Sequence, residues 1–207
     1  MKIVHDPALF KRIGADVLEH FTRRHGPPTQ PTGHAGAGAL SGRVVLVSSV
    51  YAGEGKSFVA QGLASALAGQ QEGDVVWVDA AFSTPPVETD IFARGASGFS
   101  EIMTLGSLQG LAPAVAGPDR LWRLGRGVLA QASLLHRPDA VRQGLRALRA
   151  GFALTVLDAP SLDACGALLA GADAVVLVVD TRRTSHVAAQ QALAAAGIGR
   201  ASCRERV

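Results

Sequence analysis

The stretch SSVYAGEGKS (48–57) decides the fold, because it joins a strand pattern directly to a helix pattern. The residues before it, RVVLVS (43–48), form a short β-branched run, and SFVAQGLASALAG (57–69) has the composition of a helix that Gly69 ends. A glycine-rich turn between a strand and a helix points backbone N–H groups inward, at the positive end of the helix dipole. The stretch therefore predicts a phosphate-binding loop in an α/β domain.

The residue types in this loop suit the binding of a nucleoside triphosphate with Mg²⁺. The glycines let the backbone turn tightly, Lys56 reaches the β- and γ-phosphates, and the Ser57 hydroxyl ligates Mg²⁺. One position departs from the full pattern, which has glycine six residues before the lysine, where this chain has Val50. The predicted nucleotide-binding residues are Gly53, Glu54, Gly55, Lys56, Ser57 and Phe58.

Two aspartates end predicted strands further along the chain. Asp79 ends DVVWVD (74–79), and Asp158 ends FALTVLD (152–158). In an open parallel sheet the carboxyl ends of the strands face one crevice, so we expect both side chains beside the phosphate loop, on neighbouring strands. A carboxylate there can hold Mg²⁺ through water or orient an attacking nucleophile. The predicted catalytic residues are Lys56, Asp79 and Asp158, and the predicted Mg²⁺ ligands are Ser57, Asp79 and Asp158.

The rest of the chain continues to alternate between strand and helix patterns. The further expected elements are a short helix within GFSEIMTLG (98–106), a strand at RLWRL (120–124), a helix at RPDAVRQGLRALRAG (137–151), a strand at ADAVVLVVD (172–180) and a helix at TSHVAAQQALAAAG (184–197). Such alternation implies a parallel sheet with right-handed crossovers. Residues 43–197 therefore predict a doubly wound, mostly parallel α/β domain of the P-loop NTPase class.

The segment before this domain divides into a helix and a linker. Residues 1–25 hold an amphipathic helix at 6–25, whose apolar face includes Phe10 and Phe21. Residues 26–42 (GPPTQPTGHAGAGALSG) are rich in Pro, Gly and small residues, which predicts a flexible linker. We expect the linker to tether the helix to the sheet domain, and we do not expect the helix to be part of that domain. The apolar face then needs a partner, either the surface of this domain or another protein.

The last ten residues, IGRASCRERV (198–207), match the translation of a common sequencing-adapter read through to its stop codon. We therefore expect this segment not to belong to the natural protein, and the domain to be truncated at its C-terminus. A further strand should follow the helix at 184–197, but the three consecutive charged residues Arg204 to Arg206 do not suit a buried one. Without the tail's three arginines and one glutamate the formal net charge falls from +3 to +1, so the charge balance gives no argument for a nucleic-acid partner.

Composition predicts a cytoplasmic protein with no membrane span. Hydrophobic residues make up 48% of the chain, but no apolar run reaches the ~18 residues of a spanning helix. The first residues, MKIVHDPALFKR, contain no apolar core of a signal peptide. Outside the tail Cys165 is the only cysteine, so no internal disulfide can form, which agrees with a reducing compartment. We expect Cys165 to be a small core residue.

The order of these motifs resembles that of the bacterial tyrosine autokinases, the cytoplasmic ATPase partners of exopolysaccharide co-polymerases. A phosphate loop is followed by a strand ending in aspartate (VVWVDAAFSTPP, 75–86) and by a strand ending in Asp-x-Pro (LTVLDAP, 154–160). Further segments that fit are GFSEIM (98–103), LWRLGRG (121–127) and GADAVVLVVDTRRTS (171–185). The resemblance covers roughly residues 43–197 and is most specific at GEGKS.

The resemblance implies ATP and Mg²⁺ as cofactors and a role in exopolysaccharide or capsule synthesis. Lys56 and Ser57 correspond to the Walker A motif, Asp158 to Walker B, and Asp79 to the family's second acidic motif. In an active kinase Lys56 and Mg²⁺ would neutralise charge on the transferring phosphoryl group, and Asp79 would position or activate a tyrosine hydroxyl. The resemblance also implies a polysaccharide co-polymerase membrane protein as partner, membrane association through that partner, and a homo-oligomer.

Departures from the family pattern leave two functions open. The second acidic motif is Asp-x-Asp-x-Arg in the family, whereas Ala81 and Ser83 follow Asp79 here. The family's Glu-x-x-Arg-x-x-Arg segment is not evident in residues 1–42, and its tail of clustered tyrosines is absent. The chain is therefore either an ATP-dependent tyrosine autokinase or a kinase-inactive regulatory module that cycles between nucleotide states to control a membrane partner.

Two related classes fit the motifs less well. Partitioning and division-site ATPases carry a signature lysine five residues before the phosphate-loop lysine, where this chain has Tyr51. A GTPase would carry an Asn-Lys-x-Asp motif that reads the base, and this sequence contains none. ATP is therefore the favoured nucleotide.

A row of arginines recurs at helical spacing within residues 137–151. Arg142, Arg146 and Arg149 would lie along one side of that helix. The row predicts either a solvated face or a docking surface for an acidic partner.

Overall fold

The computed structural model describes residues 7–26, 42–82, 97–109, 114–115 and 120–198, and their strands form one sheet. The strands are β1 (Arg43–Ser49), β2 (Val75–Asp79), β3 (Ala114–Val115), β4 (Leu121–Leu124), β5 (Leu154–Asp158) and β6 (Ala174–Val178). Their order is β3-β4-β2-β5-β1-β6, in which only the two-residue β3 runs antiparallel to its neighbour. The predicted mostly parallel α/β sheet is confirmed.

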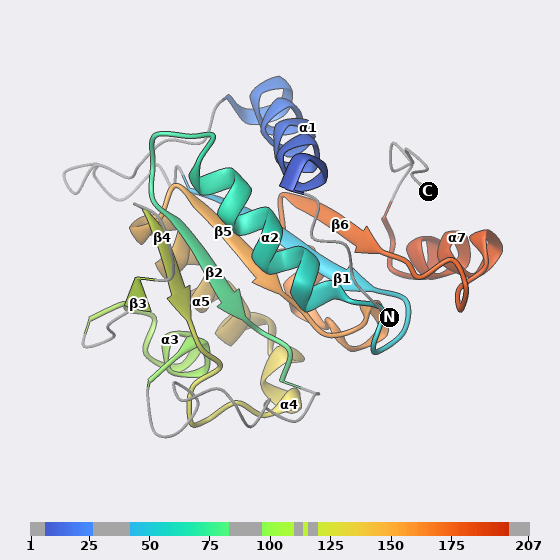
Figure 1. Ribbon diagram of the computed structural model, residues 1–207. Helices are drawn as coiled ribbons and strands as arrows, with labels where there is room; N and C mark the ends of the chain where they lie inside the picture. Colours follow the sequence, from blue (N-terminus) through green and yellow to red (C-terminus); the bar gives the residue numbers. More distant parts are fainter. Residues whose placement is uncertain (1–6, 27–41, 83–96, 110–113, 116–119, 199–207) are drawn as a thin grey trace.

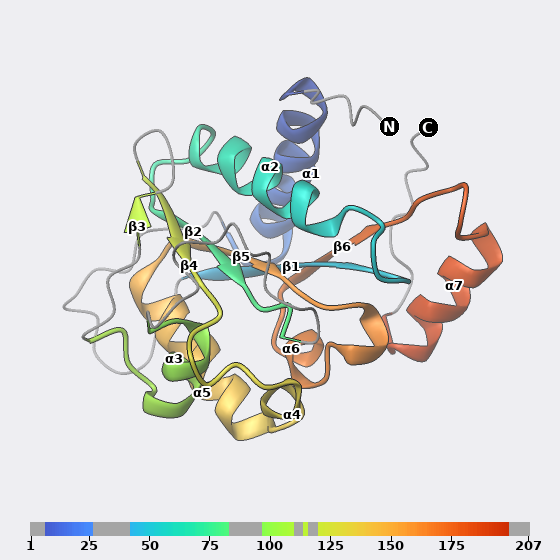
Figure 2. The same ribbon diagram turned by 60° about the horizontal axis from the view of Figure 1, so that its bottom comes forward.

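Helices cover both faces of this sheet, as a doubly wound domain requires (Figures 1 and 2). The helices are α1 (Pro7–His25), α2 (Lys56–Ala68), α3 (Phe99–Leu105), α4 (Ala132–Leu135), α5 (Pro138–Gly151), α6 (Ala167–Ala170) and α7 (His186–Ala195), with a 3-10 turn, η1 (Leu162–Ala164). Figure 2 shows α1 and α2 on one side of the sheet and α3 to α6 on the other. The longer helices lie where the sequence predicted them, whereas α4 and α6, of four residues each, were not predicted.

Two cores, one on each face, explain why the central strands are apolar throughout. In β1, Val44 and Leu46 belong to the core beneath α3 and α5, whereas Val45 and Val47 belong to the core beneath α2. All four side chains are fully buried. A strand covered on both faces needs apolar residues at every position rather than at alternate ones. This double burial holds the carboxyl end of β1, and the loop that follows it, in one place.

Helix α1 packs directly against α2 and shares its core. Phe21 is fully buried, and Val17 is 7% exposed. Phe10 reaches the surface of α2 at Gly62, where a Cβ would lie 2.5 Å from the phenyl ring. Of the two partners that the sequence allowed for the apolar face, the structure shows this domain. Helix α1 is thus packed into the domain, contrary to the expectation that it is not built in, because Gly62 on α2 leaves room for the Phe10 ring. Most of the predicted linker, residues 27–41, lies outside the described residues, so the flexible tether stays a prediction.

The arginine row on α5 does not form one solvated face. Arg142 and Arg146 are exposed, but Arg149 turns inward and pairs with Asp173, 2.6 Å away, where β6 begins. Arg149 also donates to the carbonyl oxygens of Gly42 and Gly171, both at 2.9 Å. The prediction of a solvated face therefore holds for Arg142 and Arg146, but it is wrong for Arg149, whose side chain makes tertiary contacts instead.

At the opposite edge of the sheet from β3 lie β6 and α7. Every residue of β6 is half-buried, and α7 has no buried residue. The predicted non-native tail falls, apart from Ile198, outside the described residues. Among the described residues, none of the helices has both the length and the apolar character that a membrane span requires.

Candidate nucleotide-binding site

The loop between β1 and α2 has the backbone geometry of a phosphate-binding turn. Gly53 and Gly55 adopt φ angles of 83° and 88°, in the left-handed region that side chains other than glycine's rarely tolerate. Gly55 is the N-cap of α2, and no side chain caps the helix there. The first N–H groups of a helix have no acceptor within it, so those of α2 remain available to a bound anion.

Glu54 fastens this loop to the segment between β6 and α7. Its side chain is buried, and Oε2 accepts a hydrogen bond from the Tyr51 amide at 2.8 Å. Oε1 accepts from the Asp180 amide at 3.1 Å and from the Thr184 hydroxyl. Glu54 was predicted as a nucleotide-binding residue, and these contacts give it a part in shaping the loop.

Lys56, Ser57 and Asp158 come together at the amino end of α2 and the carboxyl end of β5. Lys56 is only 7% exposed, and the Ser57 side chain lies near the Asp158 carboxylate. Burial raises the pKa of Asp158 to about 6, and the neighbouring charge of Asp79 adds to the rise. Ser57, Lys56 and Arg126 act in the opposite direction but do not cancel it.

Asp79 lies beside Asp158, because β2 and β5 are adjacent parallel strands and these two residues are in register. The prediction that the two aspartates lie at the ends of neighbouring strands, near the phosphate loop, is therefore confirmed. Asp79 Oδ2 accepts a hydrogen bond from Arg126 Nε at 2.7 Å, and Oδ1 accepts from the Ala81 amide at 3.0 Å. The ion pair is largely shielded, with the Arg126 side chain 16% and the Asp79 side chain 13% exposed.

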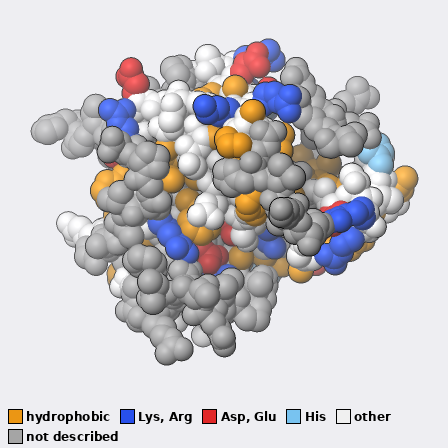
Figure 3. Space-filling model, in the orientation of Figure 1, with side chains coloured by type: hydrophobic (Ala, Val, Ile, Leu, Met, Phe, Trp, Pro, Cys, Tyr) orange, Lys and Arg blue, Asp and Glu red, His pale blue; other side chains and the backbone are white. Residues whose placement is uncertain are grey.

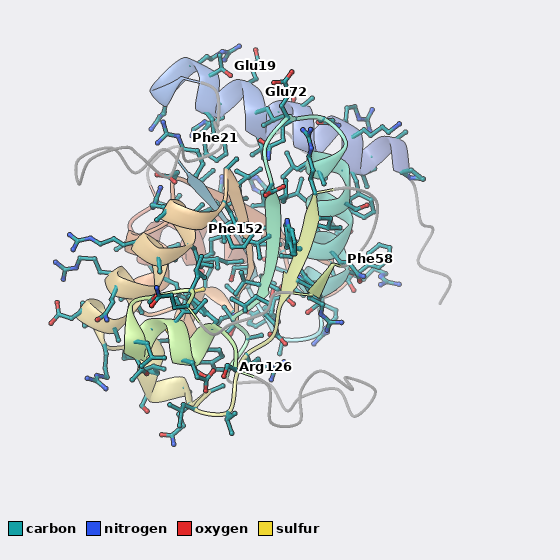
Figure 4. The ribbon with its side chains drawn as sticks, turned by 90° about the vertical axis from the view of Figure 1, so that its left-hand side faces the viewer. Glu19, Phe21, Phe58, Glu72, Arg126 and Phe152 are labelled. Atoms are coloured by element: carbon teal, nitrogen blue, oxygen red, sulfur yellow. The ribbon has the colours of Figure 1, made fainter. Side chains whose placement is uncertain are left out.

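Arg126 is a site residue that sequence reasoning did not identify. It lies in the loop after β4, beyond the carboxyl end of that strand (Figure 4). The signal was present in LWRLGRG (121–127), where glycines flank the arginine. The pairing with Asp79 requires β4 to lie next to β2, and this strand order is not visible in the sequence.

Glu101, in the first turn of α3, holds the loop that carries Arg126. Its carboxylate accepts from the amides of Gly98 at 2.6 Å, Val128 at 2.9 Å and Leu129 at 3.0 Å. Burial alone would raise the pKa of Glu101, but the hydrogen bonds from the Gly98 and Leu129 amides and from Ser100 outweigh it and lower the pKa. These hydrogen bonds hold in place the loop from which Arg126 contacts Asp79.

The oxygen atoms around Asp158 suit a Mg²⁺ ion. Asp158 Oδ1 is buried and has no hydrogen-bond partner among the described residues, which is the state expected of an oxygen that awaits a cation. With the Ser57 hydroxyl beside it, the site offers two hard oxygen donors at the phosphate loop. Both oxygens of Asp79 already accept hydrogen bonds, so contact with a metal through water suits Asp79 better than direct ligation.

The Phe58 side chain points away from this site. Its ring packs edge-on against Phe10 of α1, with the ring centroids 5.6 Å apart. Any contact of Phe58 with a nucleotide must therefore come from its backbone amide in the first turn of α2.

Solved structures of bacterial tyrosine kinase domains share this fold. The VpsO kinase domain has a TM-score of 0.64 at 20% identity, over 94% of this chain and 92% of that chain. For the BceF tyrosine kinase domain the TM-score is 0.69 at 16% identity, over 93% and 73% of the two chains. The kinase domain of the Escherichia coli tyrosine kinase ETK gives a TM-score of 0.63 at 18% identity, over 80% and 71%.

ATPases of the ParA family share the architecture as well. A ParA-family ATPase from Chlorobium tepidum TLS has a TM-score of 0.53 at 17% identity, over 67% of this chain and 60% of that chain. A Cyanothece McdA–ATP complex has a TM-score of 0.55 at 16% identity, over 74% and 64%. Neither models of protein families nor curated proteins match the chain by sequence. The likeness therefore shows the fold alone: this chain has the α/β architecture of bacterial tyrosine kinase domains, which a ParA-family ATPase shares.

Proposed function

We propose that this chain binds ATP as its Mg²⁺ complex at the loop 48–57. The observation that carries the proposal is the convergence of a glycine turn, a buried lysine and an unpaired carboxylate oxygen at the start of α2. Lys56 supplies the charge-assisted contact to phosphate, and Ser57 and Asp158 supply oxygen ligands for the cation. Mg²⁺, when bound, would neutralise charge on the phosphates.

We further propose that the protein is a cytoplasmic member of an exopolysaccharide or capsule synthesis system and acts there as a tyrosine autokinase. The likeness in fold to tyrosine kinase domains supports this proposal. In phosphoryl transfer Lys56 would hold the transferring group, and Asp79 would orient the attacking tyrosine hydroxyl and accept its proton. A polysaccharide co-polymerase membrane protein would be the partner through which the protein reaches the membrane, and a homo-oligomer would be the active form.

A second function, a kinase-inactive nucleotide switch, is favoured by the surroundings of Asp79. Ala81, 3% exposed, stands where the autokinase pattern has a second aspartate, so only one carboxylate remains in that motif. The remaining carboxylate is paired with Arg126 and also accepts a hydrogen bond from the Ala81 amide, so both of its oxygens are already engaged. Such a site can bind and release nucleotide and control a partner without transferring a phosphoryl group.

Substitution of Lys56 tests the nucleotide-binding proposal. We expect Lys56→Ala to lose a charge-assisted phosphate contact of about 2–3 kcal/mol, and so to weaken ATP binding by about 30- to 150-fold or more. Calorimetric titration with Mg²⁺-ATP measures this effect, and circular dichroism checks that the fold is retained. The control is Lys11→Ala, which removes a lysine from the exposed side of α1. Equal affinities for wild type and Lys56→Ala would remove the nucleotide site from this loop.

Phosphoryl transfer separates the two functions. An autokinase should transfer phosphate from ATP to tyrosine in a supplied tyrosine-containing peptide, and Asp79→Asn should abolish the transfer while ATP still binds. A protein that binds ATP with the expected dependence on Lys56 but forms no phosphotyrosine would be the nucleotide switch instead.

A further inference from the structure

The segment 180–185, which joins β6 to α7, is hydrogen-bonded to the loop 48–57. β6 is the parallel neighbour of β1, so the segments that follow these two strands begin side by side. Glu54 then accepts hydrogen bonds from both Asp180 and Thr184, the two ends of the tight turn in this segment. That turn is closed by the amides of Arg183 and Thr184, which both donate to the Asp180 carbonyl oxygen at 2.9 Å.

The same turn carries two arginines whose side chains make different contacts. Arg182 folds back on Asp180, with Nε 3.0 Å from Oδ1 and Nη2 2.8 Å from Oδ2. Arg183 instead extends over the phosphate loop, where Nη1 donates to the Ala52 carbonyl oxygen at 3.3 Å. Nη1 also lies 3.2 Å from the position that a Cβ on Gly53 would take. A patch of basic side chains, drawn in blue, lies on the right of Figure 3.

The geometry points to Arg183 as a further phosphate-binding residue, supplied by the β6–α7 segment to a nucleotide in the loop 48–57. This inference rests on the proposed ATP binding and adds to it a second cationic contact. A guanidinium group has five N–H donors, and within the described part of the chain the Arg183 side chain donates one hydrogen bond, to Ala52, which leaves further donors to face a ligand. Arginine is well suited to phosphate oxygens because its planar fork donates to two of them at once.

The position of Arg183 complements the opposite side of the site. Asp158 lies on β5, which flanks β1 on one side, and Arg183 follows β6, which flanks β1 on the other. A triphosphate in the loop would therefore lie between the metal-binding oxygens and this guanidinium group. The buried Glu54 carboxylate within the loop adds negative charge, which a nearby guanidinium group offsets.

The neighbouring arginine provides a matched control for the test. In calorimetric titration with Mg²⁺-ATP at constant ionic strength, we expect Arg183→Ala to weaken binding about tenfold and Arg182→Ala to change it by less than about twofold. Arg183→Gln keeps a polar side chain but loses the charge, so it should bind as weakly as Arg183→Ala. Arg183→Lys keeps the charge and should recover part of the affinity. The melting temperature of the ligand-free protein should stay the same in all four variants.

If wild type binds ATP and Lys56→Ala does not, the proposed nucleotide site stands, and three results would then overturn the inference about Arg183. The first is wild-type affinity in Arg183→Ala, the second is wild-type affinity in Arg183→Gln, and the third is an equal loss in Arg182→Ala. Failure of wild type to bind ATP, or binding that does not depend on Lys56, would instead refute the proposed function itself.

Discussion

At the scale of one residue, Asp158 carries a cost in stability at the proposed cation site. Its carboxylate lies at the end of a fully buried strand, with one oxygen that no described residue satisfies. An ionised carboxylate in such surroundings is unfavourable in the ligand-free protein, and its pKa rises from 3.8 to about 6 as a result. A cation bound to this carboxylate would remove that cost.

This residue predicts a stability that depends on pH. The pKa of Asp158 is raised in the folded state, so the folded protein binds the proton more tightly and loses stability as pH rises from about 4 through about 6. The asparagine in Asp158→Asn cannot ionise. We therefore expect the change in the free energy of unfolding caused by this substitution to be more favourable at pH 7.5 than at pH 4, by about 1–3 kcal/mol.

Urea denaturation of the metal-free and nucleotide-free protein at the two pH values measures the difference. Asp163→Asn, at an exposed position a few residues along, is the control for removing a negative charge. An effect of Asp158→Asn that is the same at both pH values would contradict the account of a buried, ionised carboxylate.

At the scale of elements, the close approach of α1 and α2 depends on a glycine. The amino-acid pattern alone predicted α1 as an amphipathic helix but could not say what its apolar face covers. The structure shows that Phe10 fills the space that Gly62 leaves open on α2, while Phe21 reaches the sheet core (Figure 4). Glycine in the middle of a helix normally costs about 1 kcal/mol relative to alanine, so its presence in α2 has a packing reason.

We therefore expect Gly62→Ala to destabilise the protein despite the better helix propensity of alanine. The added Cβ would meet the Phe10 ring at 2.5 Å, and overpacking of this kind costs about 1–3 kcal/mol. The control is Gly69→Ala at the end of α2, where φ is −84° and the nearest atom to a Cβ lies 3.6 Å away. Thermal or urea unfolding should show a loss for the first variant and no loss for the second. The reverse order would show that α1 does not pack on α2 as described.

Replacing Phe10 as well provides a second measure of the same contact. If the ring is what opposes the new methyl group, Gly62→Ala should be less harmful in a Phe10→Leu background than in the wild type. Purely additive effects of the two substitutions would argue against the contact.

At the scale of the whole molecule, Arg149 connects three parts of the chain that are distant in sequence. From α5 it donates to the carbonyl oxygen of Gly42 just before β1, to that of Gly171, and to the carboxylate of Asp173 before β6. The same Asp173 oxygen accepts from the Val44 amide of β1 at 2.7 Å. These contacts fix the amino ends of β1 and β6 relative to α5.

We expect Arg149→Ala to lower the free energy of unfolding by about 1–3 kcal/mol, because it leaves the largely buried Asp173 carboxylate without its cation. Arg146→Ala, from the exposed side of the same helix, should change stability by less than about 0.5 kcal/mol. Denaturant unfolding of both variants measures the contrast. Similar losses in the two would mean that Arg149 acts only as a member of a solvated row.

The sequence by itself determined the features that reside in short, contiguous segments. The phosphate loop, the aspartates that end β2 and β5, and the apolar strands could be predicted because turn chemistry and burial leave local patterns. Lys56 and Ser57 needed only the order of residues around them, and parallel pairing then brought Asp79 and Asp158 together. The very short elements β3, α4 and α6 leave no such pattern and were not predicted.

Only the tertiary structure decided which distant side chains complete the site and the packing around it. The contact of Arg126 with Asp79 follows from β4 lying beside β2, and that of Arg183 with Ala52 follows from β6 lying beside β1. Arg149 likewise looked equivalent to Arg142 and Arg146 until Asp173 was placed next to it. The physical reason is the same in each case: strand order sets these neighbours, and it arises from the packing of the whole sheet rather than from any local run of residues.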